Sequence, residues 1–307
     1  MPRVAAALPA EAPRSRRWLF AVPVGLLALG YLGAIAYLRI NERRIVFAPA
    51  AYGGRTMIAP APDLRVEPAR VTTPDSVALV TWVIPPADSA TATGFWMLVC
   101  HGNAGNISIP LRQEWARAMV ATGLGLVTFD YRGFGASEDA VLDEAGVYRD
   151  AQAVYDWMVT VRGIPRDRII IYGHSLGSGV ATHLAAHAEA AGLVLEGAFT
   201  SVPDVGASVY PWLPVRLIAT QRFASAARMD SIAMPKLLLH ATDDAVIPYR
   251  FGEALFAAAG APKEFVPLTG GHDRAFKADS ATYYGAIARW LRAVTAPDVE
   301  SPQPPAH

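Results

Sequence analysis

The stretch from Ile169 to Ala186 places the strongest constraint on how this chain folds. Ile169 to Tyr172 is a β-branched and aromatic run suited to a strand buried on both faces, and residues 181–186 are helical in composition. Between them, residues 173–177 read Gly-His-Ser-Leu-Gly, a G-x-S-x-G pattern. The two glycines leave room for a tight turn, because a Cβ at either position would strike the neighbouring strand or helix. We therefore expect Ser175 on a strained strand-to-helix turn above the carboxyl edge of a sheet.

Strand-like and helix-like segments alternate along the rest of the chain. The expected strands cover residues 77–84, 95–100, 124–129, 169–172, 192–197, 236–240 and 264–268. The expected helices cover residues 111–121, 144–161, 181–186, 249–259 and 280–294. This alternation predicts an α/β fold with a mainly parallel, doubly wound sheet, and it places a site at the carboxyl ends of the strands.

Charge, cysteine content and histidine spacing exclude several classes of protein. The 307 residues carry 27 Lys+Arg against 27 Asp+Glu, which gives no electrostatic footprint for nucleic acid. The single cysteine, Cys100, excludes an internal disulfide framework and lies where a small buried hydrophobe is expected. His183 and His187 are one helical turn apart without a third ligand, which favours an ordinary helix face. With no dinucleotide fingerprint either, we expect no metal and no cofactor.

Residues 18–38 are uncharged and are long enough to span a bilayer as a helix. A cleavable signal peptide is the main alternative, because residues 34–36 are small enough for cleavage, but the apolar run is longer than a signal requires. We therefore expect an uncleaved anchor and a single-pass membrane protein. Four arginines in the basic tail 1–17 against three in residues 39–44 favour a cytoplasmic N-terminus and an exported globular domain. That domain covers residues 45–295.

Residues 296–307 are rich in proline and polar side chains, and we expect them to form a disordered tail.

Later loops supply partners for Ser175. A serine at neutral pH needs an adjacent base, and that base needs an orienting group. His272 follows the last expected strand in a glycine-flanked loop, from which its imidazole can reach across the top of the sheet to Ser175. Asp243 and Asp244 both follow the preceding strand, and either carboxylate could orient the imidazole. The chain order Ser, Asp, His is the order of the α/β-hydrolases.

From about residue 70 to residue 294 the chain resembles the α/β-hydrolase superfamily, and within it the Bem46-like group of membrane-anchored serine hydrolases. The matching segments are residues 101–106 (HGNAGN), 130–135 (DYRGFG), 173–179 (GHSLGSG) and 243–248 (DDAVIP).

This resemblance implies an α/β-hydrolase fold and assigns the acid to Asp244, with Asp243 as the fallback. An oxyanion hole needs two preorganised donors. The turn itself supplies the backbone N–H of Leu176, and the resemblance points to the N–H of Asn103 as the second donor.

Members of the superfamily insert a lid between the strands that end near residues 197 and 236. Here the segment, about residues 200–233, is long enough for one or two helices. We expect a partly open acyl pocket floored by Phe199, Trp212 and Leu213.

The sequence thus predicts a serine hydrolase that cleaves a carboxylic ester or thioester through an acyl-enzyme on Ser175. A small-molecule acyl substrate and the membrane are its expected partners. The same triad could cleave an amide or peptide bond, as in an aminopeptidase, and this is the first alternative. The second is a membrane-tethered binding protein without catalytic activity.

Overall fold

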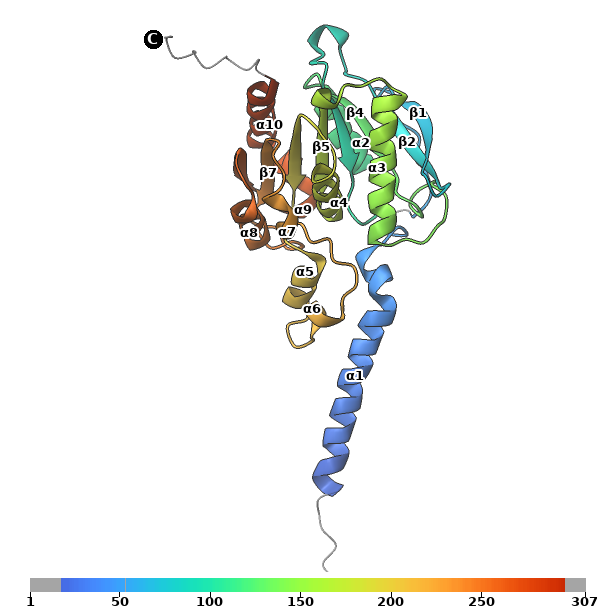
Figure 1. Ribbon diagram of the computed structural model, residues 1–307, viewed down its shortest axis with the longest axis vertical. Helices are drawn as coiled ribbons and strands as arrows, with labels where there is room; N and C mark the ends of the chain where they lie inside the picture. Colours follow the sequence, from blue (N-terminus) through green and yellow to red (C-terminus); the bar gives the residue numbers. More distant parts are fainter. Residues whose placement is uncertain (1–17, 53, 296–307) are drawn as a thin grey trace, which may run out of the picture. The chain divides into compact units, whose positions relative to one another are not determined.

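The computed structural model describes residues 18–52 and 54–295 (Figure 1). The chain divides into two compact units, with the boundary after Asn41. Most of helix α1 (Trp18–Val46) belongs to the first unit. The second unit begins at Glu42 and contains the sheet and the other described helices. The predicted tails, residues 1–17 and 296–307, lie outside the described residues.

Helix α1 contains the uncharged run and continues past it to Val46. Its segment Ala21–Val46 is long and apolar enough to cross a membrane. None of the residues in its most apolar 18-residue window is buried, and Leu27, for example, is 75% exposed. The prediction of one N-terminal helix that is a candidate membrane span is therefore confirmed.

The described part of the second unit is built on one eight-stranded sheet, in the order β1-β2-β4-β3-β5-β6-β7-β8. The strands are β1 (Glu67–Thr72), β2 (Ala78–Ile84), β3 (Trp96–Cys100), β4 (Gly125–Phe129), β5 (Ile169–His174), β6 (Gly192–Glu196), β7 (Lys236–Ala241) and β8 (Lys263–Leu268). Strand β2 pairs antiparallel with β1 and β4, and the other pairings in this sheet are parallel. The predicted mainly parallel sheet is therefore confirmed.

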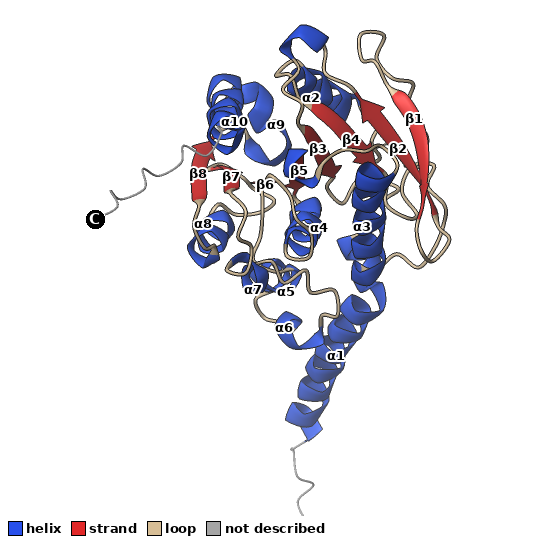
Figure 2. Cartoon of the chain, turned by 45° about the horizontal axis from the view of Figure 1, so that its top comes forward, coloured by secondary structure: helices blue, strands red, loops and turns tan. Residues whose placement is uncertain are grey.

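Helices cover both faces of the sheet (Figure 2). They are α2 (Pro110–Val120), α3 (Glu144–Thr160), α4 (Leu176–Ala185), α5 (Val202–Val209), α6 (Val215–Ile218), α7 (Ala226–Met229), α8 (Arg250–Ala258), α9 (Gly271–Ala278) and α10 (Ser280–Thr295). Two short 3-10 helices, Ser89–Thr91 and Arg166–Arg168, complete the set in the described residues.

Strand β5 shows how the two faces are filled. Alternate side chains of a strand point to opposite faces of the sheet. Ile169 and Ile171 are buried in the core that also contains residues of α3 and α4. Ile170 and Tyr172 are buried in the core that contains residues of α2 and α10. The run of large apolar residues in this strand therefore reflects burial on both sides, as the sequence predicts.

Three features of the structure are not predicted by the sequence. Strand β1 was not expected, because it is an edge strand in which only Val71 is fully buried and no apolar alternation marks it. His272 lies in helix α9 and not in a loop. The sequence does not predict this helix, because the two glycines at its start and the charged residues of its first turn conceal the helical pattern. The lid segment, residues 200–233, contains three short helices, α5 to α7, where one or two were expected.

Candidate active site

The G-x-S-x-G turn joins strand β5 to helix α4, with Ser175 between the two elements. The backbone of Ser175 has φ 53° and ψ −123°, a conformation that residues with a side chain rarely adopt. Its N–H donates to the carbonyl oxygen of Glu196 at 2.9 Å. A Cβ at Gly173 would lie 2.4 Å from the carbonyl oxygen of Gly177, and one at Gly177 would lie 2.0 Å from that of Cys100. Both glycines are therefore required by the close approach of backbone to backbone.

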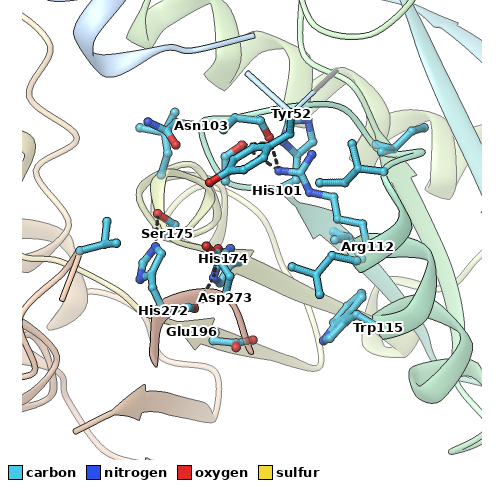
Figure 3. Close-up of a pocket in the computed structure, with 18 of the residues that line it drawn as sticks. Tyr52, His101, Asn103, Arg112, Trp115, His174, Ser175, Glu196, His272 and Asp273 are labelled. Atoms are coloured by element: carbon cyan, nitrogen blue, oxygen red, sulfur yellow. Dashed lines mark hydrogen bonds and ion pairs between the residues drawn. The ribbon is translucent and has the colours of Figure 1, made fainter. Parts of the chain in front are cut away.

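His272 faces Ser175 across the carboxyl edge of the sheet (Figure 3). Its Nε2 lies 2.8 Å from the Oγ of Ser175. It occupies the second position of α9, and its carbonyl oxygen lies 3.1 Å from Nε2 of His174, the residue before the nucleophile candidate. This contact joins the start of α9 to the turn that carries Ser175.

The two neighbouring carboxylates, Asp243 and Asp244, have different roles. Oδ2 of Asp244 lies 2.7 Å from Nδ1 of His272, while its Oδ1 accepts the N–H groups of Val246 and Ile247 at 2.8 and 2.7 Å. Asp243 instead accepts the N–H groups of Gly270 and Gly271, each at 3.0 Å. The geometry therefore makes Asp244 the partner of the imidazole and Asp243 a support for the backbone that precedes it.

The charges at this site favour a carboxylate beside an imidazole that accepts a proton readily. Burial lowers the pKa of His272, but the hydrogen bond and negative charge of Asp244 outweigh it, and the pKa lies above its usual 6.5. Burial raises the pKa of Asp244, yet hydrogen bonds from His240, His272 and the backbone bring it well below its ordinary value. With Asp244 ionised, Nδ1 of His272 carries the proton and Nε2 is the acceptor that faces Ser175.

Two backbone N–H groups of residues that line the cavity are available to a ligand. They belong to Leu176, at the first position of α4, and to Asn103, in the loop after β3. Within the described residues neither N–H has a hydrogen-bond acceptor. The Leu176 N–H also lies at a helix N-terminus, where the dipole favours negative charge.

The loop that carries Asn103 is held from two sides. On one side, the carbonyl oxygen of Asn103 accepts the N–H of Ala48 at 2.9 Å, and its side-chain amide donates to the carbonyl oxygen of Val46 at 3.3 Å. On the other side, the guanidinium of Arg112 donates to the carbonyl oxygens of Ala104 and Asn106 at 2.7 and 2.8 Å. The loop is thus fixed by α2 and by the segment that follows α1.

Sequence reasoning missed two residues that shape this site, Arg112 and Gly197. Arg112 belongs to the expected helix 111–121, but its hydrogen-bond acceptors are backbone carbonyls, which no sequence pattern reveals. Gly197 follows β6 with φ 54°, and a Cβ there would lie 3.0 Å from Cε1 of His272. Its role could be suspected only after the imidazole had been placed.

A cavity of about 790 Å³ opens beside Ser175 and His272. Its volume falls in the range of small-molecule sites. Besides residues of the carboxyl edge and of α5, it is lined by apolar side chains of α2 and of the strands β2 and β4. These side chains belong to the core on the face of the sheet that α2 covers. These deeper side chains are Trp82, Ile84, Trp115, Ala116 and Leu126.

Four charged residues are among those that line this cavity: Arg112, Glu196, Asp273 and Arg274. Glu196 is buried, and its Oε2 accepts the hydroxyl groups of Tyr172 and Tyr283 at 2.5 and 2.6 Å. The cavity therefore combines a long apolar wall with fixed polar groups close to Ser175.

The three residues expected to floor the acyl pocket have different positions. Phe199 is buried and lines the cavity. Trp212 is 60% exposed and Leu213 is buried, and neither is among the described residues that line the cavity. The expected pocket floor is therefore corrected for Trp212 and Leu213, because the cavity reaches the α5–α6 turn only as far as Tyr210 and extends along α2 on its other side.

His174, His272 and Asp273 form a cluster of metal-ligand type, with one ligand atom of each within 4.8 Å of the others. Both imidazole nitrogens of His272 are already engaged by Ser175 and Asp244, and Nε2 of His174 contacts a carbonyl oxygen. This donor set therefore fits the Ser175 site and does not fit a metal site.

Comparison with known proteins identifies the family of this chain. A family model described as alpha/beta hydrolase fold matches residues 96–228. The uncharacterized protein Rv2307c of Mycobacterium tuberculosis is 35% identical over 272 residues, which cover 87% of this chain and 93% of that protein. The chain belongs to the α/β-hydrolase family.

Two further comparisons place this α/β-hydrolase among its relatives. The lysophosphatidylserine lipase ABHD12 of Danio rerio is 34% identical over 224 residues, covering 64% of this chain and 58% of that lipase. The chain therefore matches only about half the length of that lipase. The esterase Pf2001 of Pyrococcus furiosus superimposes with a TM-score of 0.66 at 17% identity, covering 82% of this chain and all of that structure, which shows the shared fold.

Proposed function

We propose that this α/β-hydrolase is a serine hydrolase that cleaves carboxylic esters through an acyl-enzyme on Ser175. The observation that carries the proposal is the continuous contact from Ser175 Oγ through His272 to Asp244, with distances of 2.8 and 2.7 Å. Such a relay supplies a weak nucleophile with its base and holds that base in the required tautomer.

The proposed reaction follows from these contacts. Ser175 Oγ attacks the ester carbonyl carbon while its proton passes to Nε2 of His272, and the resulting oxyanion accepts the N–H groups of Leu176 and Asn103. When the tetrahedral intermediate collapses, the bond from carbon to the alcohol oxygen breaks and His272 returns the proton to that oxygen. Water then attacks the acyl-enzyme with His272 as the base, which releases the carboxylic acid and restores Ser175. Each oxyanion donor contributes about 2.7–4 kcal/mol.

The proposed substrates are esters with a long acyl chain, including single-chain lysophospholipids. The apolar wall under α2 suits such a chain, and two curated relatives, from zebrafish and rat, are named as lysophosphatidylserine lipases. Thioesters and amides use the same chemistry, and a substrate panel with one acyl chain joined to an alcohol, a thiol and an amine ranks the three. Faster cleavage of the amide than of the ester would replace this proposal with the aminopeptidase-like alternative.

Labelling with a fluorophosphonate probe tests the nucleophile. Wild-type protein is expected to be labelled and Ser175→Ala to remain unlabelled. Ser178→Ala is the matched control, because Ser178 lies one turn further along α4 and its hydroxyl has no hydrogen-bond partner among the described residues. If the wild type is not labelled while it is folded, the enzyme proposal fails and the tethered binding protein becomes the better description.

We also propose that α1 is an uncleaved anchor with its N-terminus in the cytoplasm. The excess of arginine before the uncharged run supports this orientation. In intact cells or spheroplasts, externally added protease is then expected to degrade the hydrolase unit. Protection of that unit until the membrane is opened would reverse the orientation.

A further inference from the structure

The opening of the cavity is surrounded by exposed apolar side chains. Among the described residues after Asn41, nine large hydrophobic side chains are exposed, and six of them, each 45–84% exposed, either line the cavity or belong to the lid segment that borders it. We call these six the mouth patch: Ile45, Tyr52, Val209, Trp212, Leu217 and Val246. Soluble surfaces rarely collect apolar residues in one place unless something covers them.

Contacts join the mouth patch to the cavity. Ile45, Tyr52, Val209 and Val246 line the cavity themselves, and Figure 3 shows Tyr52 above it. Leu217 lies on α6, which packs against α5, the helix that ends with Val209. The patch therefore borders the route by which a substrate reaches Ser175.

The position of Ile45 along the chain indicates what covers the patch. Leu38 is the last residue of the uncharged run, and the seven further helical residues to Ile45 add about 10 Å. The headgroup layer on each side of a bilayer is about 5–8 Å thick. A helix that crosses the membrane through residues 18–38 thus leaves only seven residues of chain between the end of the crossing segment and Ile45, a residue that lines the cavity.

We propose that the mouth patch docks on a phospholipid bilayer, so that the cavity opens toward the lipid headgroups. Tyr52 and Trp212 are of the amphipathic type that prefers this boundary, and Leu217 and Val246 supply apolar area to insert below it. The further consequence, that acyl substrates enter from the bilayer without passing through water, rests on the proposed ester hydrolysis.

Fluorescence quenching tests the docking without any activity measurement. Cys100 is the only cysteine in the sequence and is buried, so an added cysteine can be labelled selectively. Leu217→Cys carries a fluorophore in the patch. Val161→Cys is the matched control, because Val161 is also exposed but follows the far end of α3, about 25 Å from Glu144. Glu144 marks the end of α3 near α6, since its N–H donates to Gln221, three residues after α6 in the sequence.

The full chain is placed in phosphatidylcholine nanodiscs with and without nitroxide-labelled phosphatidylcholine. The nitroxide lipid is expected to reduce fluorescence at position 217 about twofold or more and to leave position 161 unchanged. Equal quenching at both positions, or none at 217, overturns the docking proposal. Shielding of position 217 from aqueous iodide without nitroxide quenching also overturns it, since a protein would then cover the patch.

Leu217→Asp tests the route of the substrate. It is expected to lower kcat/KM for lysophosphatidylcholine presented in vesicles about fivefold to tenfold. Hydrolysis of water-soluble p-nitrophenyl acetate is expected to stay unchanged, and Val161→Asp to affect neither substrate. Equal loss on both substrates, or no loss on either, contradicts entry from the bilayer. If the wild type hydrolyses neither ester, the proposed function fails, while the quenching result still decides the docking.

Discussion

The turn around Ser175 and the lid segment, residues 200–233, border the same cavity but are constrained in opposite ways. At the turn, backbone atoms within 2.4 Å of the position of an added Cβ leave Gly173 and Gly177 no alternative. In the lid, α6 and α7 are four residues long, and Leu217 is mostly exposed. Where backbone packs on backbone, only glycine fits. Where a side chain faces solvent, many residue types are compatible with the fold. We therefore expect kcat to be sensitive to substitutions at the carboxyl edge and to tolerate substitutions in the lid.

The largest expected effect contrasts Asp244 with its neighbour. Asp244→Asn removes the charge that orients and stabilises the His272 imidazole, and kcat is expected to fall about 10³- to 10⁴-fold. Asp243→Asn affects only the N–H groups of Gly270 and Gly271, and a loss below about tenfold is expected. Steady-state kinetics on a soluble ester measure both. A larger loss in Asp243→Asn would return the orienting role to Asp243.

A smaller loss is expected from Gly197→Ala. The new Cβ would lie 3.0 Å from Cε1 of His272, and φ 54° is unfavourable for alanine, so the imidazole moves and kcat falls about 10²-fold. Gly285→Ala is the control, because a Cβ there meets only Arg289 Nη1, at 3.9 Å, and alanine favours helix. Circular dichroism distinguishes a misfolded variant from a folded variant in which the His272 imidazole is displaced. Full activity in a folded Gly197→Ala protein would show that the edge is less crowded than its geometry indicates.

The pH dependence of kcat/KM tests the protonation state of His272 without substituting this residue. His272 must be neutral to accept the Ser175 proton, and its pKa lies above 6.5 because of Asp244. Activity is therefore expected at high pH and is lost as the pH falls through that raised pKa, which places the acid limb of kcat/KM above pH 6.5. Asp243→Asn should leave the limb in place. A limb below pH 6.5 would mean that burial dominates over the carboxylate.

The smallest effect is expected in the lid. Trp212→Ala should change kcat/KM for a soluble short-chain ester less than about twofold, because Trp212 does not line the cavity. Phe199→Ala removes a buried wall of the cavity and should lower kcat/KM for a medium-chain ester about tenfold. Reversed effects would restore the pocket that the sequence suggested.

The candidate site could be anticipated largely because its members follow strand ends. Ser175, Asp244 and His272 come after β5, β7 and β8, whose carboxyl ends meet at one edge in a parallel sheet. The choice between Asp243 and Asp244 was different, because both follow the same strand and only their hydrogen bonds separate them. The resemblance to a known family favours Asp244, and in the structure Asp244 is the carboxylate that contacts His272.

The cavity could not be anticipated in the same way. Its deeper wall combines Trp82, Trp115 and Leu126 from three separate elements, and in the sequence each looks like an ordinary core residue. The sequence instead favours the lid, because its aromatic residues lie close together in the chain. Periodicity reports which side chains are buried, but it does not report where packing leaves a space.

The contacts of Asn103 have a consequence for how a water-soluble form should be prepared. The carbonyl oxygen of Val46 and the N–H of Ala48 hold the loop that presents the Asn103 amide. A truncation or proteolytic cut near Asp63 would remove both while sparing the whole sheet. Such a fragment could fold and still be a poor catalyst, so a soluble version should start before Glu42 and keep the final turns of the helix.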